Sequence, residues 1–414
     1  MRSVLRWAMV GWVSAALLGC SGDDDDGAPG GGGCDLRVAP GDNDTEALQT
    51  ALVEARSNQV ICLSPGTYQI NDLITVGATP GLTIRGTGER PEDVLLDFSG
   101  QVSGDDGMLA TGDRITIENF AMKNTRGNGV VVSGATGVVF RKLKVSWDRG
   151  SDTQNGAYAV YPTRSEDVLV EDCEVVGASD AGIYVGQSRR AVVRRNVAHG
   201  NVIGIEVENT IEAEIYDNEA YDNTVGIFVP LLPNLQQTES RATLIRDNLI
   251  YENDRTNFGP PGTVVAFMPP GVGIVLLSSD DVRVHGNTIR DHASTAIGIV
   301  GQAVMDEITG SAANDPRSDG FPERIYIHDN TFERNGQAPK GILATLGAVP
   351  LEAVVWDGSE RSAGSAELCL GDPPQASFRN FGGVSGVGNP GAHSTDTTQH
   401  RCTLPDLAPV VVTE

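Results

Sequence analysis

A set of aromatic and acidic residues in the middle of the sequence could form a face that binds sugars. Aromatic rings can stack on sugar rings, and carboxylates accept hydrogen bonds from hydroxyl groups. The spacing of the set would bring its members into neighbouring positions of a repeat. These residues are Tyr161, Tyr184, Glu206 and Phe228, with Trp147 and Asp180 near them. The alternative is that inserted loops cover the aromatic residues.

The same region holds groups that a lyase or epimerase acting on uronates would need. Such an enzyme uses a cation to neutralise the sugar carboxylate, a base for the C5 proton and a proton donor. Arg149, Asp148 or Glu206, and Tyr161 or Tyr184 could fill these roles. The sequence does not show that they converge, and it lacks a DPHD-like motif. It leaves open whether the protein is an enzyme or carries only solvated turn residues here.

Two histidines form a second candidate site. Alignment of the repeats would place His285 and His328 on adjacent strands, facing the same way. Two imidazoles at that spacing could bind copper or zinc if a loop supplied a third ligand. The alternative is a pair of histidines on an ordinary strand face. The acidic composition is also compatible with calcium, although no cofactor is predicted.

A repeat of short strands positions these candidates. Gly182-Ile183, Gly204-Ile205 and Gly226-Ile227 are each separated by 22 residues. Short segments with alternating inward residues and polar turns recur between residues 138 and 332, and this period of two is typical of strands. At about 3.3 Å per residue, one repeat completes one coil of a three-sided solenoid. The sequence predicts an all-β fold, a right-handed parallel β-helix over residues 34–342.

Two features of the repeat predict the interior. Asparagines recur at one inward turn position and should form a hydrogen-bonded ladder: Asn196, Asn218, Asn248, Asn287 and Asn330. Cys173 occupies the same position, so it is expected to be a buried, unpaired thiol. Three longer segments, Pro230–Arg241, Asp254–Val272 and Gln302–Glu323, interrupt the repeat and should carry function.

Each end of the solenoid requires a cap, since an open end exposes strand edges. Residues 43–55 have helical spacing, with Asp44 or Thr45 as the expected N-cap. Residues 343–414 lose the repeat and are expected to form an irregular C-terminal covering segment. That segment, or an inserted loop, should cover an unusually apolar outward column that contains Val139, Leu169 and Val192. The predicted disulfides are Cys34–Cys62 and Cys369–Cys402.

Residues 1–20 have the features of a lipoprotein signal peptide, with Leu17–Cys20 as its lipobox. Cys20 is then expected to carry the lipid that anchors the chain in a bacterial envelope, at the outer membrane. Ordinary secretory cleavage is the alternative. Residues 21–33 are a Gly/Asp-rich tether. The net charge of −25 argues against nucleic acid and against docking on anionic lipid, so the lipid would be the only membrane attachment.

The segment from Asn155 to Thr210 resembles a family of bacterial envelope lipoproteins named for parallel β-helix repeats, within the pectin-lyase-like superfamily. The resemblance implies the fold and the envelope location, but it supplies no catalytic residues. Some members of that family occur with a second exported protein, which implies a possible protein partner. We therefore expect a polysaccharide-binding module. The alternatives are a metal- or redox-linked accessory protein and a polysaccharide lyase or uronate epimerase.

Overall fold

The computed structural model describes residues 33–310, 315–386 and 389–413, so the expected signal peptide, Cys20 and tether residues 21–32 lie outside the described residues. Residues from Cys34 onward form one compact unit. Within the described parts of the chain, no helix has the length and apolar character needed to cross a membrane.

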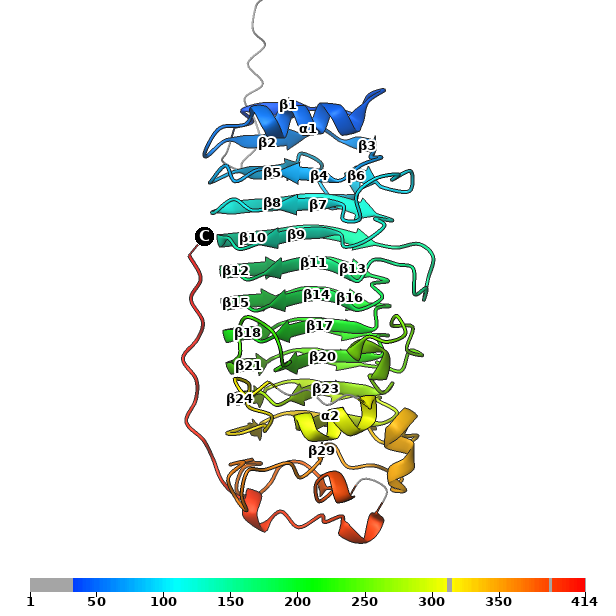
Figure 1. The fold of residues 1–414 in the computed structure, drawn as a ribbon, viewed down its shortest axis with the longest axis vertical. Helices are drawn as coiled ribbons and strands as arrows, with labels where there is room; N and C mark the ends of the chain where they lie inside the picture. The colour runs from blue at the N-terminus through cyan, green and yellow to red at the C-terminus, as the bar shows by residue number, and fades with distance from the viewer. Residues whose placement is uncertain (1–32, 311–314, 387–388, 414) are drawn as a thin grey trace, which may run out of the picture. The chain divides into compact units, whose positions relative to one another are not determined.

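The compact unit is a solenoid of parallel strands, stacked coil upon coil (Figure 1). One side is an 11-stranded sheet, made of β4 (Ile74–Val76), β7 (Met108–Ala110), β9 (Val130–Ser133), β11 (Tyr158–Thr163), β14 (Ala181–Gly186), β17 (Ile203–Glu208), β20 (Val225–Pro230), β23 (Val272–Leu277), β26 (Thr295–Val300), β29 (Val354–Trp356) and β30 (Phe378–Asn380). The repeat therefore extends beyond the expected end at residue 342, because β29 and β30 continue this sheet.

A 19-stranded sheet bends around the other two sides. Its first side contains β1 (Leu36–Val38), β2 (Val60–Leu63), β5 (Thr83–Gly86), β8 (Ile115–Lys123), β10 (Thr136–Ser146), β12 (Glu166–Glu171), β15 (Arg189–Arg194), β18 (Ile211–Tyr216), β21 (Arg241–Arg246), β24 (Asp280–His285) and β27 (Tyr326–His328). Its second side contains β3 (Gly66–Gln69), β6 (Val94–Asp97), β13 (Glu174–Val176), β16 (Val197–His199), β19 (Glu219–Tyr221), β22 (Leu249–Tyr251), β25 (Thr288–Arg290) and β28 (Thr331–Glu333), and the long strands β8 and β10 reach both sides.

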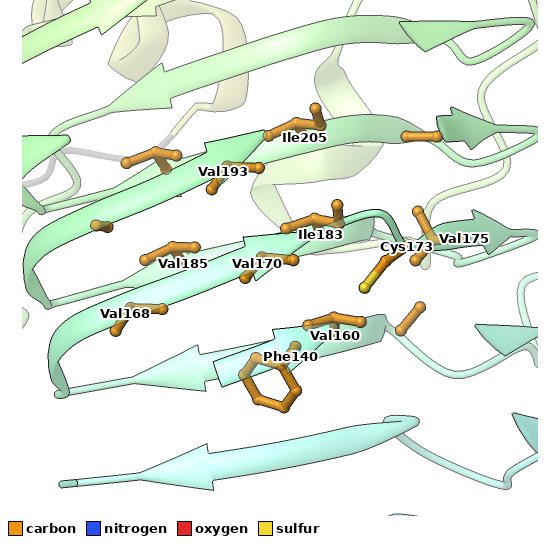
Figure 2. Close-up of a cluster of buried hydrophobic side chains, with 14 of the residues drawn as sticks. Phe140, Val160, Val168, Val170, Cys173, Val175, Ile183, Val185, Val193 and Ile205 are labelled. Atoms are coloured by element: carbon orange, nitrogen blue, oxygen red, sulfur yellow. The ribbon is translucent and has the colours of Figure 1, made fainter. Parts of the chain in front are cut away.

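The register of the strands confirms the predicted repeat. Ile183 pairs with Ile205, and Ile205 pairs with Ile227. Inward side chains from the three sides fill the solenoid, as Figure 2 shows for Phe140, Val170, Ile183 and their neighbours. Cys173 lies among them as a free, buried thiol, as predicted, and burial raises its pKa to about 12.

The predicted asparagine ladder is also confirmed. The side-chain amide of Asn196 donates to Oδ1 of Asn218 at 3.0 Å, and the same bond joins each later pair up to Asn330. A second ladder runs five residues further along each coil: Asn201, Asn223, Asn253, His292 and Asn335. This second ladder was not predicted from the sequence, although each of its members follows a member of the first ladder by five residues.

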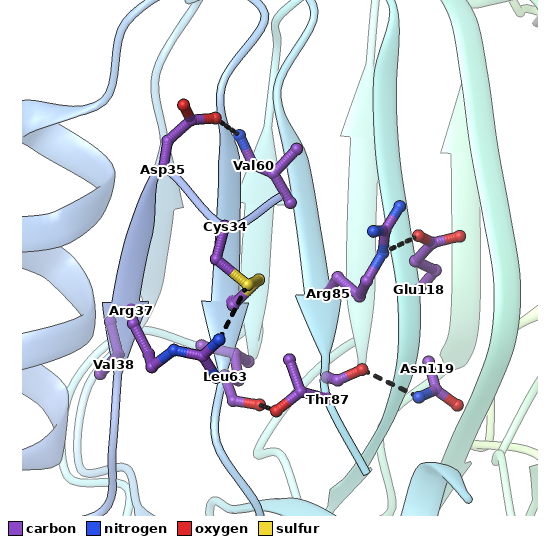
Figure 3. Close-up of a disulfide and its surroundings, with 12 residues drawn as sticks. Cys34, Asp35, Arg37, Val38, Val60, Leu63, Arg85, Thr87, Glu118 and Asn119 are labelled. Carbon is purple, nitrogen blue, oxygen red and sulfur yellow. Dashed lines mark hydrogen bonds and ion pairs between the residues drawn. A yellow bond between two sulfur atoms is a disulfide. The ribbon is translucent and has the colours of Figure 1, made fainter. Parts of the chain in front are cut away.

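A helix caps the N-terminal end. Helix α1 (Asp44–Glu54) lies where the sequence predicts it, but the N-cap position is Asn43, which makes no capping side-chain bond. The expected caps were wrong because the Asp44 carboxylate instead accepts hydrogen bonds from the backbone amides of Gly41 and Gln69. The disulfide Cys34–Cys62 ties the entry of β1 to β2 (Figure 3).

The C-terminal segment folds back along the solenoid, where it runs beside the strands in Figure 1. Val410 and Val412 pack against Val139, Leu169 and Val192, and this contact confirms the predicted cover over that apolar column. The Cys369–Cys402 disulfide, also predicted, holds the start of this returning segment.

Candidate functional site

The outward face of the 11-stranded sheet carries a group of acidic and aromatic residues that we call the carboxyl–tyrosine cluster. Alternation along β14 and β17 turns three of these side chains outward, and the strand register places Tyr184 beside Glu206 and Gly186 beside Glu208. Asp180 precedes β14. The members of the cluster are Tyr158, Tyr161, Asp180, Tyr184, Glu206 and Glu208.

The three tyrosine rings are in mutual contact. The centroid of Tyr158 lies 4.6 Å from that of Tyr161 and 4.5 Å from that of Tyr184, and Tyr161 meets Tyr184 edge-on at 4.8 Å. Tyr161 and Tyr158 are half-buried, whereas Tyr184 is buried. The first two therefore form the accessible edge of the cluster.

Two tyrosine hydroxyls bind two of the carboxyl groups. Tyr184 Oη donates to Glu208 Oε1 at 2.5 Å, and Tyr158 Oη donates to Asp180 Oδ2 at 3.2 Å. Glu206 differs, because its side chain is only 4% exposed and its Oε2 atom has no hydrogen-bond partner among the described residues. Since buried polar atoms are nearly always hydrogen-bonded, this oxygen is a candidate contact for a ligand.

Burial raises the pKa of all three carboxyl groups, and neighbouring carboxylates raise it further for Asp180 and Glu206. Burial raises the pKa of Glu208 to about 7, and burial and the charge of Glu208 raise the pKa of Asp180 to about 7. The pKa of Glu206 is raised well above its ordinary value by burial and then by the charges of Asp180 and Glu208. Near neutral pH the cluster therefore holds protonated carboxyl groups, which can both donate and accept hydrogen bonds.

Inserted segments cover much of the aromatic row that the sequence predicts. Phe228 is 2% exposed and packs with Tyr184 in a cluster that includes Phe258, Val265 and Met268 of the second insertion. Tyr184 and Phe228 are therefore covered and do not belong to an exposed aromatic face. For these two residues the alternative stated above, that inserted loops cover them, is the one observed. The second insertion packs on the sheet because this contact removes the apolar side chains of the insertion and those of the sheet from water.

The remaining candidates from the turn before β11 do not join the cluster. Trp147 is buried in the solenoid core and its indole nitrogen donates to the carbonyl oxygen of Thr125 at 2.8 Å, so it offers no stacking face. Asp148 and Arg149 are exposed. In the described part of the chain, neither has a hydrogen bond or ion pair to the cluster. The residues proposed as cation, base and proton donor of a lyase therefore do not lie together in one site.

The two histidines lie as predicted on adjacent strands. His285 pairs with His328 in register, and their ring centroids are 5.0 Å apart. His328 Nδ1 is 2.7 Å from the Asp329 carboxylate, and its ring stacks on Tyr326. No third ligand within the described ranges completes a metal site with this pair.

Among the described residues, one group of three acidic side chains, Asp280, Asp319 and Glu323, is close enough to share a cation. Arg324 lies 3.4 Å from Asp280, and Arg361 pairs with Glu323 at 3.1 Å, so these two arginines already offset part of the charge of the three carboxyl groups. The sequence predicts no particular position for calcium, and calcium binding stays a prediction.

Two cluster members were not among the predicted site residues. Tyr158 starts its strand, and Glu208 follows Glu206 with the alternation of a strand. That alternation is the signal that places Glu208 on the same face as Glu206. The alternation of its strand does not indicate that Tyr158 belongs to the cluster. Its hydrogen bond to Asp180 links two successive coils and is seen only in the folded structure.

Comparison with known proteins agrees with this architecture. Residues 97–231 match the family model described as a right-handed β-helix region. The chain folds as a right-handed β-helix. No curated protein sequence matches this β-helix.

Two solved structures show similar folds. The A-module of mannuronan C-5 epimerase AlgE6 from Azotobacter vinelandii aligns with 12% identity and a TM-score of 0.50, covering 76% of this β-helix and 85% of that chain. The catalytic unit of a GH87 alpha-1,3-glucanase from Streptomyces thermodiastaticus aligns with 17% identity and a TM-score of 0.50, covering 81% and 53%. At such identities these likenesses concern the fold alone.

Proposed function

We propose that this β-helix binds a glycan at the accessible edge of the carboxyl–tyrosine cluster. The observation that carries the proposal is the Glu206 carboxyl, buried with an unpartnered oxygen beside two further carboxyl groups. The half-buried rings of Tyr158 and Tyr161 supply apolar faces next to these polar groups. Aromatic faces with adjacent hydrogen-bonding groups suit the alternating C–H and O–H surface of a sugar.

The charge of the cluster favours one class of glycan. The charges of Asp180 and Glu208 raise the pKa of Glu206, and the charge of Glu208 raises the pKa of Asp180, so an additional carboxylate from a uronate would add to this repulsion. A neutral sugar or an amino sugar adds no negative charge. The charges of the cluster therefore favour binding of neutral or amino sugars over the uronate lyase or epimerase alternative. The two structural neighbours are named as enzymes of polysaccharides, which agrees with a sugar ligand.

We also propose that the β-helix acts in the bacterial envelope, anchored through lipid on Cys20. The lipobox at Leu17–Cys20 and the Gly/Asp-rich tether support this location. Metabolic labelling with an alkynyl fatty acid should mark the protein and should fail to mark the Cys20→Ser variant. Equal labelling of both proteins would exclude the anchor.

A glycan-array screen tests the binding proposal. We expect neutral or amino-sugar glycans to bind the wild-type protein, and we expect Glu206→Gln to weaken binding about fivefold, the factor for one lost hydrogen bond of about 1 kcal/mol between neutral groups. Tyr161→Ala should also weaken it. The matched control is Asp148→Asn, an exposed acidic residue outside the cluster. A preference for oligouronates, or binding that Glu206→Gln and Tyr161→Ala leave unchanged, would contradict the proposal.

A further inference from the structure

An apolar cavity of about 90 Å³ lies on the outward side of the 11-stranded sheet. Three short helices enclose it, namely η2 (Val264–Phe267), α2 (Gln302–Thr309) and η3 (Gly341–Leu346). Its wall includes the side chains of Phe228, Met268, Val275, Met305 and Leu343. A dry apolar cavity of comparable size can bind a small apolar molecule.

A glycine in the sheet leaves this space open. Val275 pairs with Gly298, and Gly298 pairs with Val355, so one outward side chain is missing from the row. A Cβ atom on Gly298 would meet only Val272 and Val355 methyl groups, both at 4.0 Å. The cavity is therefore the volume that a side chain at position 298 would occupy.

A second pocket, of about 240 Å³, adjoins the cavity and is lined by polar as well as apolar side chains; we call the wall formed by Glu208, Gln302 and Asp306 its polar end. The two spaces share Phe267, Leu277 and Met305 in their walls. The polar end holds two carboxylate side chains, Glu208 and Asp306, and the Gln302 amide. None of the described residues that line it is a lysine, arginine or histidine.

The polar groups at this end are arranged as hydrogen-bond acceptors. Gln302 Nε2 donates to Asp306 Oδ1 at 2.8 Å, so the amide group's nitrogen is already engaged. Gln302 Oε1 is buried and has no partner among the described residues. An ammonium group carries three donors and no acceptor, which suits such a set.

We propose that the two adjoining pockets together bind an amphipathic primary amine, with its alkyl chain in the apolar cavity and its ammonium group at Glu208, Gln302 and Asp306. The flexible methionines and the Phe228 ring in the wall suit an alkyl chain. The Asp306 carboxylate balances the ammonium charge, and Glu208 and Gln302 supply further oxygen acceptors. This inference does not rest on glycan binding, although Glu208 also belongs to the carboxyl–tyrosine cluster.

Calorimetric titration with n-alkylamines tests the inference, using the Cys20→Ser protein purified without detergent. From ethylamine to hexylamine, affinity should rise about fourfold for each added methylene until the cavity is full, and then level off. Hexanoate, which has the same chain and the opposite charge, should bind at least about tenfold more weakly than hexylamine. Equal affinity of ethylamine and hexylamine, or of hexylamine and hexanoate, would overturn the inference.

Two variants separate the two ends of the pocket. Gly298→Leu should fill the cavity and remove the gain from chain length, whereas Asp306→Asn should reduce the preference for hexylamine over hexanol. A chain-length gain that persists in folded Gly298→Leu overturns the assignment of the cavity. If circular dichroism shows that Gly298→Leu is unfolded, the test uses the Cys20→Ser protein alone. A rise in affinity that continues with chain length through decylamine would then overturn the assignment of the cavity. If no glycan on the array binds while hexylamine does, glycan binding is rejected and the amine site is retained.

Discussion

Glu208 offers a quantitative test of the cluster's burial. Burial raises its pKa from 4.5 to about 7, partly opposed by the hydrogen bond from Tyr184. A difference of this size corresponds to about 3 kcal/mol of unfolding free energy, since one pKa unit is worth about 1.4 kcal/mol. The folded state holds this proton more tightly than the unfolded state. The stabilising contribution is therefore complete below the unfolded pKa, near 4.5, and is lost as the pH rises through 7.

The variant Glu208→Gln removes this titration and keeps an acceptor for the Tyr184 hydroxyl. The other carboxyl groups that face Glu208 are Asp180 and Glu206, which titrate in the same direction, and the pKa of Tyr184 is raised, so that tyrosine stays neutral. Between pH 4.5 and 8.5, we expect the wild-type protein to lose about 3 kcal/mol more stability than the variant.

Urea unfolding followed by circular dichroism at several pH values measures this difference. The free energies of wild type and Glu208→Gln should agree near pH 4.5, separate as the pH rises from 4.5 to 7, and differ by a constant amount above about pH 8. Asp148→Asn, which changes an exposed carboxylate, should give a curve parallel to wild type. If the free energies of unfolding of wild type and Glu208→Gln changed in parallel with pH, burial would not raise the pKa of Glu208. That result would refute the reasoning.

Four further predictions concern the second ladder and the C-terminal segment. His292→Ala should lower the free energy of unfolding in urea by about 1–3 kcal/mol, because it leaves buried ladder amides unpaired, whereas His292→Asn should cost less. Burial lowers the pKa of His292 to about 4. The stabilising contribution of the neutral imidazole is therefore complete above pH 6.5 and is lost as the pH falls through 4. Between pH 6.5 and 4, the free energy of unfolding of wild type should fall more than that of His292→Asn. Replacing Cys369 and Cys402 by serine should cost about 3 kcal/mol in the same measurement. Val410→Asp should release the C-terminal segment, detected as faster cleavage of residues 403–413 in limited proteolysis, and equal cleavage rates would contradict the packing.

The repeat was predictable because each coil contacts its neighbours through the same local pattern. The alternation of apolar residues and the constant 22-residue step set the register of Ile183, Ile205 and Ile227. The second ladder was equally regular, and comparison of positions 201, 223 and 253 would have found it. Helix α2 was missed because its eight residues lie in an insertion that belongs to no repeat.

The sequence by itself determined the strands of the 22-residue repeat and the first inward ladder, since these depend on local period and spacing, and it also predicted both disulfide pairs. The tertiary structure alone decided which outward residues reach water. Phe228 and Tyr184 have outward positions on their strands, yet residues 254–272 fold over them and bury them. An insertion has no period from which its path can be read, so the cover, the apolar cavity beneath it and the unpartnered Glu206 carboxyl emerge only when the whole chain is packed.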